Sequence, residues 1–503
     1  MPRFHPPGPA RQGGAHSHVL RGLRFLPPRR PLRQVAAGQQ ASAPEAVGSA
    51  PTSGYGAGLD DEEFWKPTAA NVVRWAAMLL IVGVVMINAA HKTKLAYAAV
   101  PLALALAISS PAGALAASLL AAALPGALGN TNIGAQLPTL LLGPVLLHGA
   151  IGLASGARSP RRPLALLALM ALIVFVADAT HKSPQELVDY APRYQGLVVL
   201  LGACATRWRP KDRTFLLQVI LLAGGALAVS TIVRLRGHAG TETAKNAEMV
   251  LRGVADGFDP NYCACWLGSA ILSSVVLAAD LFLVRKKLVA ALFWLAPSAV
   301  CLAAMGLCAS RGMFLALMLA GGTMFLTTPV SWAARLRLCA GAAAVLVAAG
   351  LAGSFKLLIA RFQEGDIGDG DGRLQIWAWA LGVFARLQPW EKAVGGGSER
   401  NFAEVGWSTH NNYLDCLLDY GVVGLLCFAC FVTVLLVGAR RLSWSLRLPA
   451  LAFLVFLALA CASLVPLMYE WGWVVLALVV VCVQAGNSAD LAPGTARPVA
   501  ARI

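Results

Sequence analysis

Apolar stretches of about 18 to 24 residues recur along most of the chain, which is the length that an α-helix needs to cross the hydrocarbon core of a bilayer. Backbone amides and carbonyls find no water in that core, so each stretch must satisfy them inside its own helix. Hydrophobic residues make up 57% of the chain and charged residues only 13%, well below the charged fraction of a soluble protein. The sequence therefore predicts an all-α polytopic membrane protein.

The apolar stretches predict about 12 to 14 transmembrane helices in two groups. A bundle is expected over residues 66–353 and C-terminal membrane helices over 413–486, with a large helical extracytoplasmic loop near 354–412 between them. Residues 1–65, rich in Pro, Arg, Gly and Ala, are expected to be a disordered cytoplasmic tail or an over-long start, and 487–503 a second cytoplasmic tail. The spans are predicted at residues 69–90, 95–110, 112–128, 135–154, 163–180, 191–206, 214–233, 262–284, 288–308, 312–328, 337–353, 413–437, 448–466 and 470–485.

Basic residues give the chain a formal net charge of +16, and most of them gather in alternate loops. Positively charged loops stay on the cytoplasmic side of a membrane, so this alternation predicts the orientation of the spans and accounts for the charge without nucleic-acid binding. The loops assigned to the cytoplasm carry Arg158, Arg161 and Arg162; Arg207, Arg209, Lys211 and Arg213; Arg285, Lys286 and Lys287; Arg335 and Arg337; and Arg440, Arg441 and Arg447.

Two loops on the predicted outer face also carry cations, although topology does not require them there. An anionic ligand at that face would account for both groups. Arg234, Arg236, Lys245 and Arg252 lie in the first loop, and Lys356, Arg361, Arg373, Arg386, Lys392 and Arg400 in the second.

The second outer loop contains three distinct segments before its glycine-rich turn at residues 395–397. Residues 355–362 read as a short amphipathic helix on the membrane surface. The acidic, glycine-rich run that follows fails as an EF-hand calcium loop, because Ile367 would occupy the first ligand position and Ala378 the position that requires Glu. A helix is then expected from Arg373 to a point before Pro389.

Arg373 is one of two outer-face arginines that could hold phosphate oxygens through paired hydrogen bonds. The alternative for it is a surface arginine that reaches lipid headgroups. Arg311, in the sequence Ser310-Arg311-Gly312, interrupts apolar sequence at the outer boundary, where a partner for its charge is expected. Asp259 opens the sequence D-P-N-Y, which indicates a turn and a helix entry at the same face, and a plain cap is the simpler interpretation.

His410 lies at the predicted start of the next membrane helix, in the sequence S-T-H-N-N-Y-L-D. Ser408 or Thr409 is expected to cap this helix, which would place His410 in the first turn. The positive end of the helix dipole disfavours imidazolium there, so the ring would stay neutral and able to accept a proton. A structural histidine is the alternative. The polar side of this helix, expected to face protein or a water-filled cleft, carries Asn411, Asn412, Asp415 and Asp419.

Eleven cysteines are scattered through the chain, mostly inside apolar stretches. Cys427 and Cys430 form a C-x-x-C pattern within a predicted membrane helix. Cysteines in such surroundings behave as small hydrophobic residues, so neither a redox nor a metal role is expected.

Taken together, these segments resemble the O-antigen ligase and polymerase superfamily of bacterial membrane glycosyltransferases. The matching motifs are D-P-N at 259–261, S-R-G at 310–312, G-R-L-Q-I-W at 372–377, P-x5-G-G-G at 389–397, and H-N-N-Y-L-D with the trailing Y-G-V-V-G at 410–424. In that family the outer-face loop binds a lipid-diphosphate-linked glycan, and two arginines and one histidine are the functional residues. The resemblance implies these catalytic roles for Arg311, Arg373 and His410.

The resemblance further implies an O-antigen ligase of the bacterial inner membrane, with a periplasmic active face and both termini in the cytoplasm. Such an enzyme moves an O-antigen polysaccharide from undecaprenyl diphosphate to a sugar hydroxyl of lipid A-core by inverting transfer, with no metal or other cofactor. His410 would be the general base, and Arg311 and Arg373 would bind the diphosphate. Membrane lipids are the other expected partners. The residues expected to contact substrates are Asn411, Asn412, Tyr413, Arg252, Asn261, Arg361, Gly395 and Gly397.

Other functions stay open on the sequence alone. A repeat-unit polymerase and a protein O-oligosaccharyltransferase share these motifs and differ in the acceptor. The outer arginines at 234–252 favour the ligase, because they could also meet a phosphorylated lipid A-core. A secondary transporter would need ionisable residues near the membrane midplane and two related halves; Asp178, Asp280 and Asp415 are its few candidates, and no clear repeat is present. A lipid-binding scaffold would explain the basic loops but not H-N-N-Y-L-D.

Overall fold

The computed structural model of the protein describes residues 72–73, 75–83, 99–123, 132–154, 161–189, 194–238, 259–284, 286–328, 330–351, 353–364, 373–398, 408–464 and 470–489. These residues all belong to one compact unit, Leu59–Ile503. The elements in this part of the chain are helices, and no strand occurs among them.

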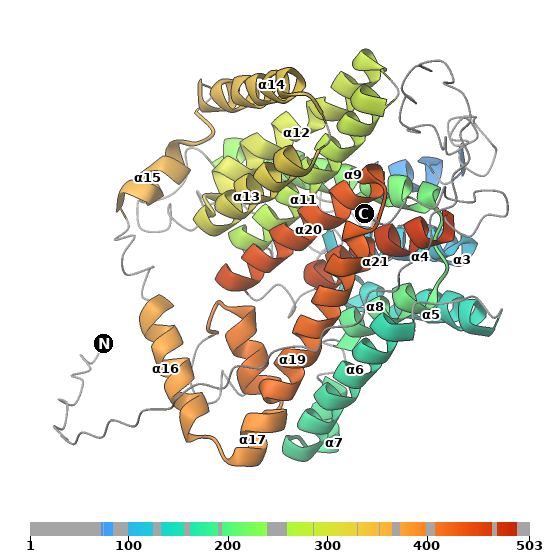
Figure 1. Cartoon of the computed structure of the whole chain (residues 1–503), viewed down its shortest axis with the longest axis vertical. Coiled ribbons are helices and arrows are strands. Elements are labelled where there is room, and N and C mark those ends of the chain that lie inside the picture. Colours follow the sequence, from blue (N-terminus) through green and yellow to red (C-terminus); the bar gives the residue numbers. More distant parts are fainter. Residues whose placement is uncertain are drawn as a thin grey trace, which may run out of the picture. The chain divides into compact units, whose positions relative to one another are not determined.

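The helices follow the apolar stretches of the sequence closely (Figure 1). In chain order they are α3 (Ala99–Ser109), α4 (Pro111–Ala123), α5 (Asn132–Ala154), α6 (Arg161–His181), α7 (Pro184–Asp189), α8 (Gln195–Ala205), α9 (Pro210–His238), α11 (Pro260–Ala279), the π-helical segment η4 (Asp280–Val284), α12 (Leu288–Cys308), α13 (Arg311–Thr327), α14 (Trp332–Leu351), α15 (Lys356–Glu364), α16 (Arg373–Arg386), α17 (Pro389–Val394), α19 (Asn412–Arg440), α20 (Trp444–Ser463) and α21 (Glu470–Ala489).

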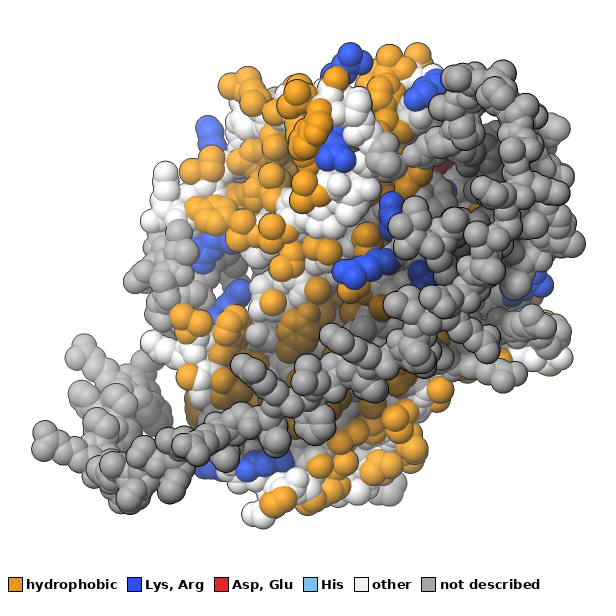
Figure 2. Space-filling view, in the orientation of Figure 1, with side chains coloured by type: hydrophobic (Ala, Val, Ile, Leu, Met, Phe, Trp, Pro, Cys, Tyr) orange, Lys and Arg blue, Asp and Glu red, His pale blue; other side chains and the backbone are white. Residues whose placement is uncertain are grey.

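Seven of the described helices are long and apolar enough to cross a membrane, and six further apolar helices are shorter. Large apolar side chains such as Phe175, Val289 and Phe293 are exposed on these helices, at 57%, 82% and 70% of their surface. Hydrophobic side chains also cover much of the described surface in Figure 2, with Lys and Arg in small separate groups. Such a surface suits lipid rather than water. The predicted all-α polytopic membrane protein is confirmed, and the span count of 12 to 14 stays a prediction.

Helix α11 lies at the centre of the buried core, where it packs against α9, α12, α13 and α20. Aromatic side chains fill the space beside it. The rings of Phe456 on α20 and Trp471 on α21 meet edge to face, with their centroids 5.8 Å apart. The indole N–H of Trp471 donates to Ser269 Oγ on α11 at 3.0 Å, so this buried donor has its hydrogen bond inside the apolar core.

Small residues allow the core helices to approach closely, as is usual for helices packed within a membrane. Gly224 on α9 faces Ala270 on α11, and a Cβ atom added to Gly224 would lie 2.3 Å from the Cβ of Ala270. The next residue, Gly225, has open space where its Cβ would stand. The two neighbouring glycines therefore differ in what they contribute, although the sequence presents them as equals.

One predicted span differs from its expected form. The stretch 413–437 was expected to be a single membrane helix, but α19 is broken at Gly421, whose φ of 66° and ψ of −172° are not helical. The break leaves a short polar helix up to Tyr420 and a longer apolar helix after it. A helix break leaves backbone carbonyls without partners in their own helix, and the groups that bind them belong to the candidate site.

Substituting the two neighbouring glycines of α9 tests the close packing of the core. Gly224→Ala should destabilise the protein by about 1–3 kcal/mol, because the added methyl group must push α9 and α11 apart. Gly225→Ala should be neutral or stabilise by up to about 1 kcal/mol, because alanine favours the helix and meets no neighbour. The midpoint of thermal unfolding of the purified protein in detergent measures both effects. Equal midpoints for the two variants would contradict the close contact between α9 and α11.

Candidate active site

The segments that carry the motifs meet at the C-terminal end of α20. Carbonyl groups in the last turn of a helix have no partner inside it. Here the Ser463 carbonyl accepts a hydrogen bond from Arg373 Nη1 at 3.2 Å, and the Leu464 carbonyl accepts one from the backbone N–H of Asn412 at 3.1 Å. Gly312 also approaches this end, because a Cβ atom on it would lie 2.8 Å from Ser463 Oγ. The starts of α13, α16 and α19 are thus gathered at one point.

Hydrogen bonds join the D-P-N and S-R-G segments directly. Asp259 is the N-cap of α11, and its carboxylate accepts from the Asn261 amide at 2.7 Å. The Asn261 side chain in turn accepts from Ser310 Oγ at 2.8 Å. Ser310 immediately precedes Arg311, the half-buried first residue of α13. The cap expected at Asp259 is present, and the Asn261 side chain adds a tie to the arginine segment that the sequence did not reveal.

Arg373 is the first residue of α16, whose bounds agree with the helix predicted to end before Pro389. The buried side of α16, with Ala380 and Val383, packs against Leu414 and Leu418 of α19. This packing fixes the direction of the helix, so that its N-terminal arginine lies beside the end of α20. Arg373 is half-buried there.

The histidine segment differs from the prediction at its helix start. The N-cap of α19 is Asn411, rather than Ser408 or Thr409. Asn411 has an extended backbone, and its Oδ1 accepts from the amides of Tyr413 at 3.1 Å and Leu414 at 3.3 Å. His410 therefore precedes the helix instead of lying in its first turn. Its φ of 50° is left-handed, a conformation uncommon for residues other than glycine.

The pKa of His410 is lowered from its ordinary value, first by partial burial of the ring and then by the positive charge of Arg373. The carboxylate of Asp259 acts in the opposite direction and raises this pKa, but it is the weakest of the three causes. The imidazole is therefore neutral at neutral pH. The prediction of a neutral histidine rested on the helix dipole, whereas burial and a neighbouring arginine are the causes found. The pKa of His410 thus depends on the charges of both Arg373 and Asp259.

The glycine-rich turn at residues 395–397 forms hydrogen bonds with backbone carbonyls at the break in α19. The amides of Gly396 and Gly397 donate to the carbonyls of Leu418 and Asp419 at 3.2 and 2.9 Å. Gly395 has a φ of 84°, and a Cβ atom on it would lie 2.1 Å from the Asp419 carbonyl oxygen. Only glycine fits such a position. The turn thus satisfies carbonyls that the break exposes.

A buried aspartate anchors the residue that follows this turn. Asp178 on α6 is fully buried, and it accepts hydrogen bonds from the Ser398 amide at 2.5 Å and from Ser398 Oγ at 2.8 Å. It also accepts one from the Tyr194 hydroxyl, and Ser398 Oγ bonds Tyr420 Oη at 2.9 Å. Sequence reasoning considered Asp178 only as a transporter residue, because no local pattern connects it with Ser398.

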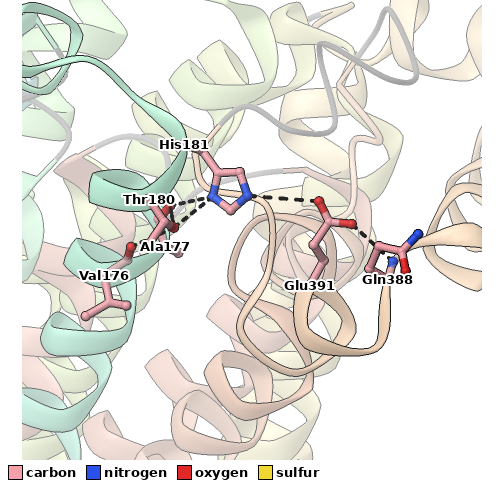
Figure 3. Close-up of polar contacts among 6 residues, drawn as sticks. All are labelled: Val176, Ala177, Thr180, His181, Gln388 and Glu391. Carbon is pink, nitrogen blue, oxygen red and sulfur yellow. Dashed lines mark hydrogen bonds and ion pairs between the residues drawn. The ribbon is translucent and has the colours of Figure 1, made fainter.

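Helix α17 also contacts the end of α6 (Figure 3). His181 Nε2 lies 3.9 Å from Glu391 Oε1, and the His181 ring stacks on Trp390 with their centroids 5.7 Å apart. Glu391 Oε2 accepts from the Gln388 amide at 3.1 Å, which completes a capping box at the start of α17. Helix α17 and the residue after the glycine-rich turn are thereby both held to the last turn of α6.

Several residues expected to contact substrate have other contacts in the structure. The Asn411 side chain caps α19, Asn412 is 5% exposed, and Tyr413 Oη donates to the Ala458 carbonyl at 2.9 Å. Their roles toward substrate, and those of Asn261, Gly395 and Gly397, stay predictions. Arg252, the acidic glycine-rich run and the side chain of Arg361 lie outside the described part of the chain.

No group of His, Cys, Asp and Glu among the described residues is arranged to hold a metal ion. All the cysteines described are free thiols, including Cys427 and Cys430. The described part of the candidate site presents two arginines at helix starts, the imidazole of His410 and backbone groups at helix ends.

Comparison with known proteins gives one family match. A family described as O-antigen ligase matches residues 296–429, about a quarter of the chain, which include Arg311, Arg373 and His410. No curated protein matches the chain. The family match supports glycosyl transfer of the ligase or polymerase type, and together with the membrane helices it suggests lipid-linked glycan substrates. The motifs and this match together support membership of the chain in the superfamily of O-antigen ligases and O-antigen polymerases.

Proposed function

We propose that the protein is an O-antigen ligase of the bacterial inner membrane. It transfers an O-antigen polysaccharide from undecaprenyl diphosphate to a sugar hydroxyl of lipid A-core on the periplasmic face. The observation that carries this proposal is that the segments of Arg311, Arg373 and His410 meet at the end of α20, where burial and the charge of Arg373 lower the pKa of His410. A base and a cation so placed suit a reaction in which one oxygen loses a proton while another group gains negative charge.

The two arginines serve the leaving group in this mechanism. Arg311 and Arg373 are the first residues of α13 and α16, so each side chain stands beside amides that have no acceptor inside their own helix. Both helix starts lie at the end of α20, near Ser463. Two guanidinium groups and helix-start amides can together stabilise a departing diphosphate through paired, charge-assisted hydrogen bonds.

His410 serves the acceptor. A sugar hydroxyl gives its proton to the neutral imidazole as its oxygen attacks the anomeric carbon. The bond between that carbon and the diphosphate oxygen breaks on the opposite side, so the configuration inverts and the diphosphate leaves with the bonding electrons. General base catalysis of this kind contributes about 10²–10⁴-fold to the rate. The histidine then returns its proton to solvent.

Two alternatives in the same superfamily use the same chemistry with another acceptor, namely the repeat-unit polymerase and the protein O-oligosaccharyltransferase. The basic residues at 234–252, which are predicted to lie on the outer face, favour the ligase because they could bind a phosphorylated lipid A-core. A secondary transporter has less support. Asp178 lies in the last turn of α6 and Asp415 in the first turn of α19, both at helix ends, whereas transported ions bind near the membrane midplane.

Substitutions at the base and at the cation test the assigned roles. His410→Ala should reduce kcat by about 10²–10⁴-fold, because the acceptor hydroxyl loses its base. Arg373→Lys should reduce it by at least about tenfold, since lysine keeps the charge but loses the paired hydrogen bonds. Glycan transfer by purified protein in nanodiscs measures both. Arg386→Lys, at the exposed far end of α16, is the matched control and should be unaffected. Folded His410→Ala protein with unchanged transfer would contradict the base role.

The pH dependence of glycan transfer tests the influence of Asp259 on the pKa of His410. Activity that needs neutral His410 falls as pH drops through the pKa of this residue. Asp259 raises that pKa, so Asp259→Asn should lower it and move the acid limb of the kcat profile to lower pH. Asparagine caps a helix as well as aspartate does, so the start of α11 should persist. A shift toward higher pH, or none, would contradict this arrangement.

Deletion of the gene separates the alternatives. Loss of a ligase should leave core lipid without O-chain and accumulate long undecaprenyl-linked polymer, because the polymer forms but cannot be transferred. Loss of a polymerase should instead leave core lipid that carries one repeat unit. Electrophoresis of lipopolysaccharide, together with extraction of the lipid-linked glycan, measures both. An unchanged lipopolysaccharide ladder would reject the ligase and the polymerase for the main O-chain and favour protein glycosylation.

A further inference from the structure

We propose that Trp377, Thr409 and Asp415 form a positioning network that holds His410 in its left-handed conformation and couples it to the helix of Arg373. This inference rests on the proposed function, in which His410 is the base and Arg373 binds the diphosphate. The three residues do not touch the reacting atoms in that mechanism. They act through the backbone on both sides of His410.

Trp377 connects the arginine helix to the histidine segment. Its indole N–H donates to the Thr409 carbonyl at 2.9 Å, directly before His410 in the chain. Trp377 is four residues after Arg373 on α16, so the two side chains lie on the same face of that helix. One face of α16 therefore carries Arg373 and, through Trp377, also binds the Thr409 carbonyl directly before His410. A movement of α16 would displace both together.

Thr409 fixes the chain from the other side. It is fully buried, and its hydroxyl lies 2.5 Å from Asp415 Oδ1 and 2.9 Å from the Asn411 carbonyl. The Thr409 hydroxyl oxygen also accepts a hydrogen bond from the Asn411 backbone amide at 3.1 Å. The carboxylate of Asp415, itself 3% exposed, is the stronger acceptor for the single hydroxyl proton. The residues before and after His410 are thus held together through one hydroxyl group.

Such a clamp is needed because the backbone of His410 is strained. A residue other than glycine keeps a positive φ only where its surroundings impose it. Without the hydrogen bonds at Thr409, His410 can relax to an ordinary negative φ, which would change the position of the imidazole relative to Arg373. A misplacement of about 1 Å in a catalytic group can cost about 10²-fold in rate. The network therefore has a catalytic effect although it lies behind the base.

Paired variants test this inference in full-length protein in nanodiscs. The probes are lipid-linked glycan and lipid A-core extracted from the deletion strain. Thr409→Val removes the hydroxyl at nearly constant shape and should lower kcat by about 10–100-fold, while Thr409→Ser keeps the hydroxyl and should stay within about threefold of the wild type. Trp377→Phe should also lower kcat by about 10–100-fold. Trp379→Phe, on the same helix but 51% exposed, is the matched control and should change nothing.

A second readout separates positioning from a loss of folded protein. Thr409→Val should move the acid limb of the kcat profile to higher pH, because an imidazole that moves away from the charge of Arg373 and into fuller contact with solvent regains a higher pKa. Reduced stability alone would lower the amount of active protein without moving this limb. Rates are therefore compared per folded protein, and the Thr409→Ser and Trp377→Phe variants decide the result if Thr409→Val does not fold.

The outcomes for this network and for the proposed function are distinguishable through His410→Ala. If that variant is inactive while Trp377→Phe and Thr409→Val keep near-normal rates and the wild-type pH profile, the network is overturned and the base role stands. If His410→Ala is fully active, the base role fails, whatever the network variants do. The network is supported if Trp377→Phe loses activity while Trp379→Phe does not, and if Thr409→Val loses activity while Thr409→Ser keeps a near-normal rate.

Discussion

Backbone carbonyls at helix ends are the constraint on which the candidate site of this protein depends. A carbonyl at a helix end or a helix break has no partner inside its own helix and needs one from elsewhere. The end of α20 finds partners in Arg373 and the Asn412 amide, and the break in α19 finds them in Gly396 and Gly397. Segments far apart in the chain are thereby bound to the same helix ends. The same hydrogen bonds that complete the helices also assemble the candidate site.

This arrangement explains why the polar residues of the site cost the fold little. Arg311 and Arg373 begin their helices, and His410 lies just before one, so no charge has to be inserted in the middle of a span. The buried carboxylate of Asp178 is likewise at a helix end, where the Ser398 amide and two hydroxyl groups bind it. Its burial is tolerated because each of its carboxylate oxygens has a donor.

The sequence predicted the elements of the site better than their connections. The position of Pro389 predicted the end of α16 closely, because helix stops depend on local chemistry. Apolar length predicted the existence of α20, but this helix runs from Trp444 to Ser463 instead of 448–466 and includes Pro449. The break at Gly421 was missed, since a glycine inside an apolar run has no local sign that distinguishes a kink from close packing. The cap was placed two or three residues early, because Ser408, Thr409 and Asn411 are all good caps. The bond between Asp178 and Ser398 joins residues with no shared pattern.

On the proposed mechanism, the pairing of Arg373 with His410 serves two steps of the reaction. Before the donor binds, burial and then the guanidinium lower the pKa of His410, and both favour the neutral ring. When a diphosphate binds Arg373, its negative charge offsets that of the guanidinium, and the pKa of His410 must rise. A stronger base accepts the proton of the acceptor hydroxyl more readily. The histidine is thus kept neutral in the empty site and becomes more basic once the donor has arrived, which links binding of the leaving group to activation of the acceptor.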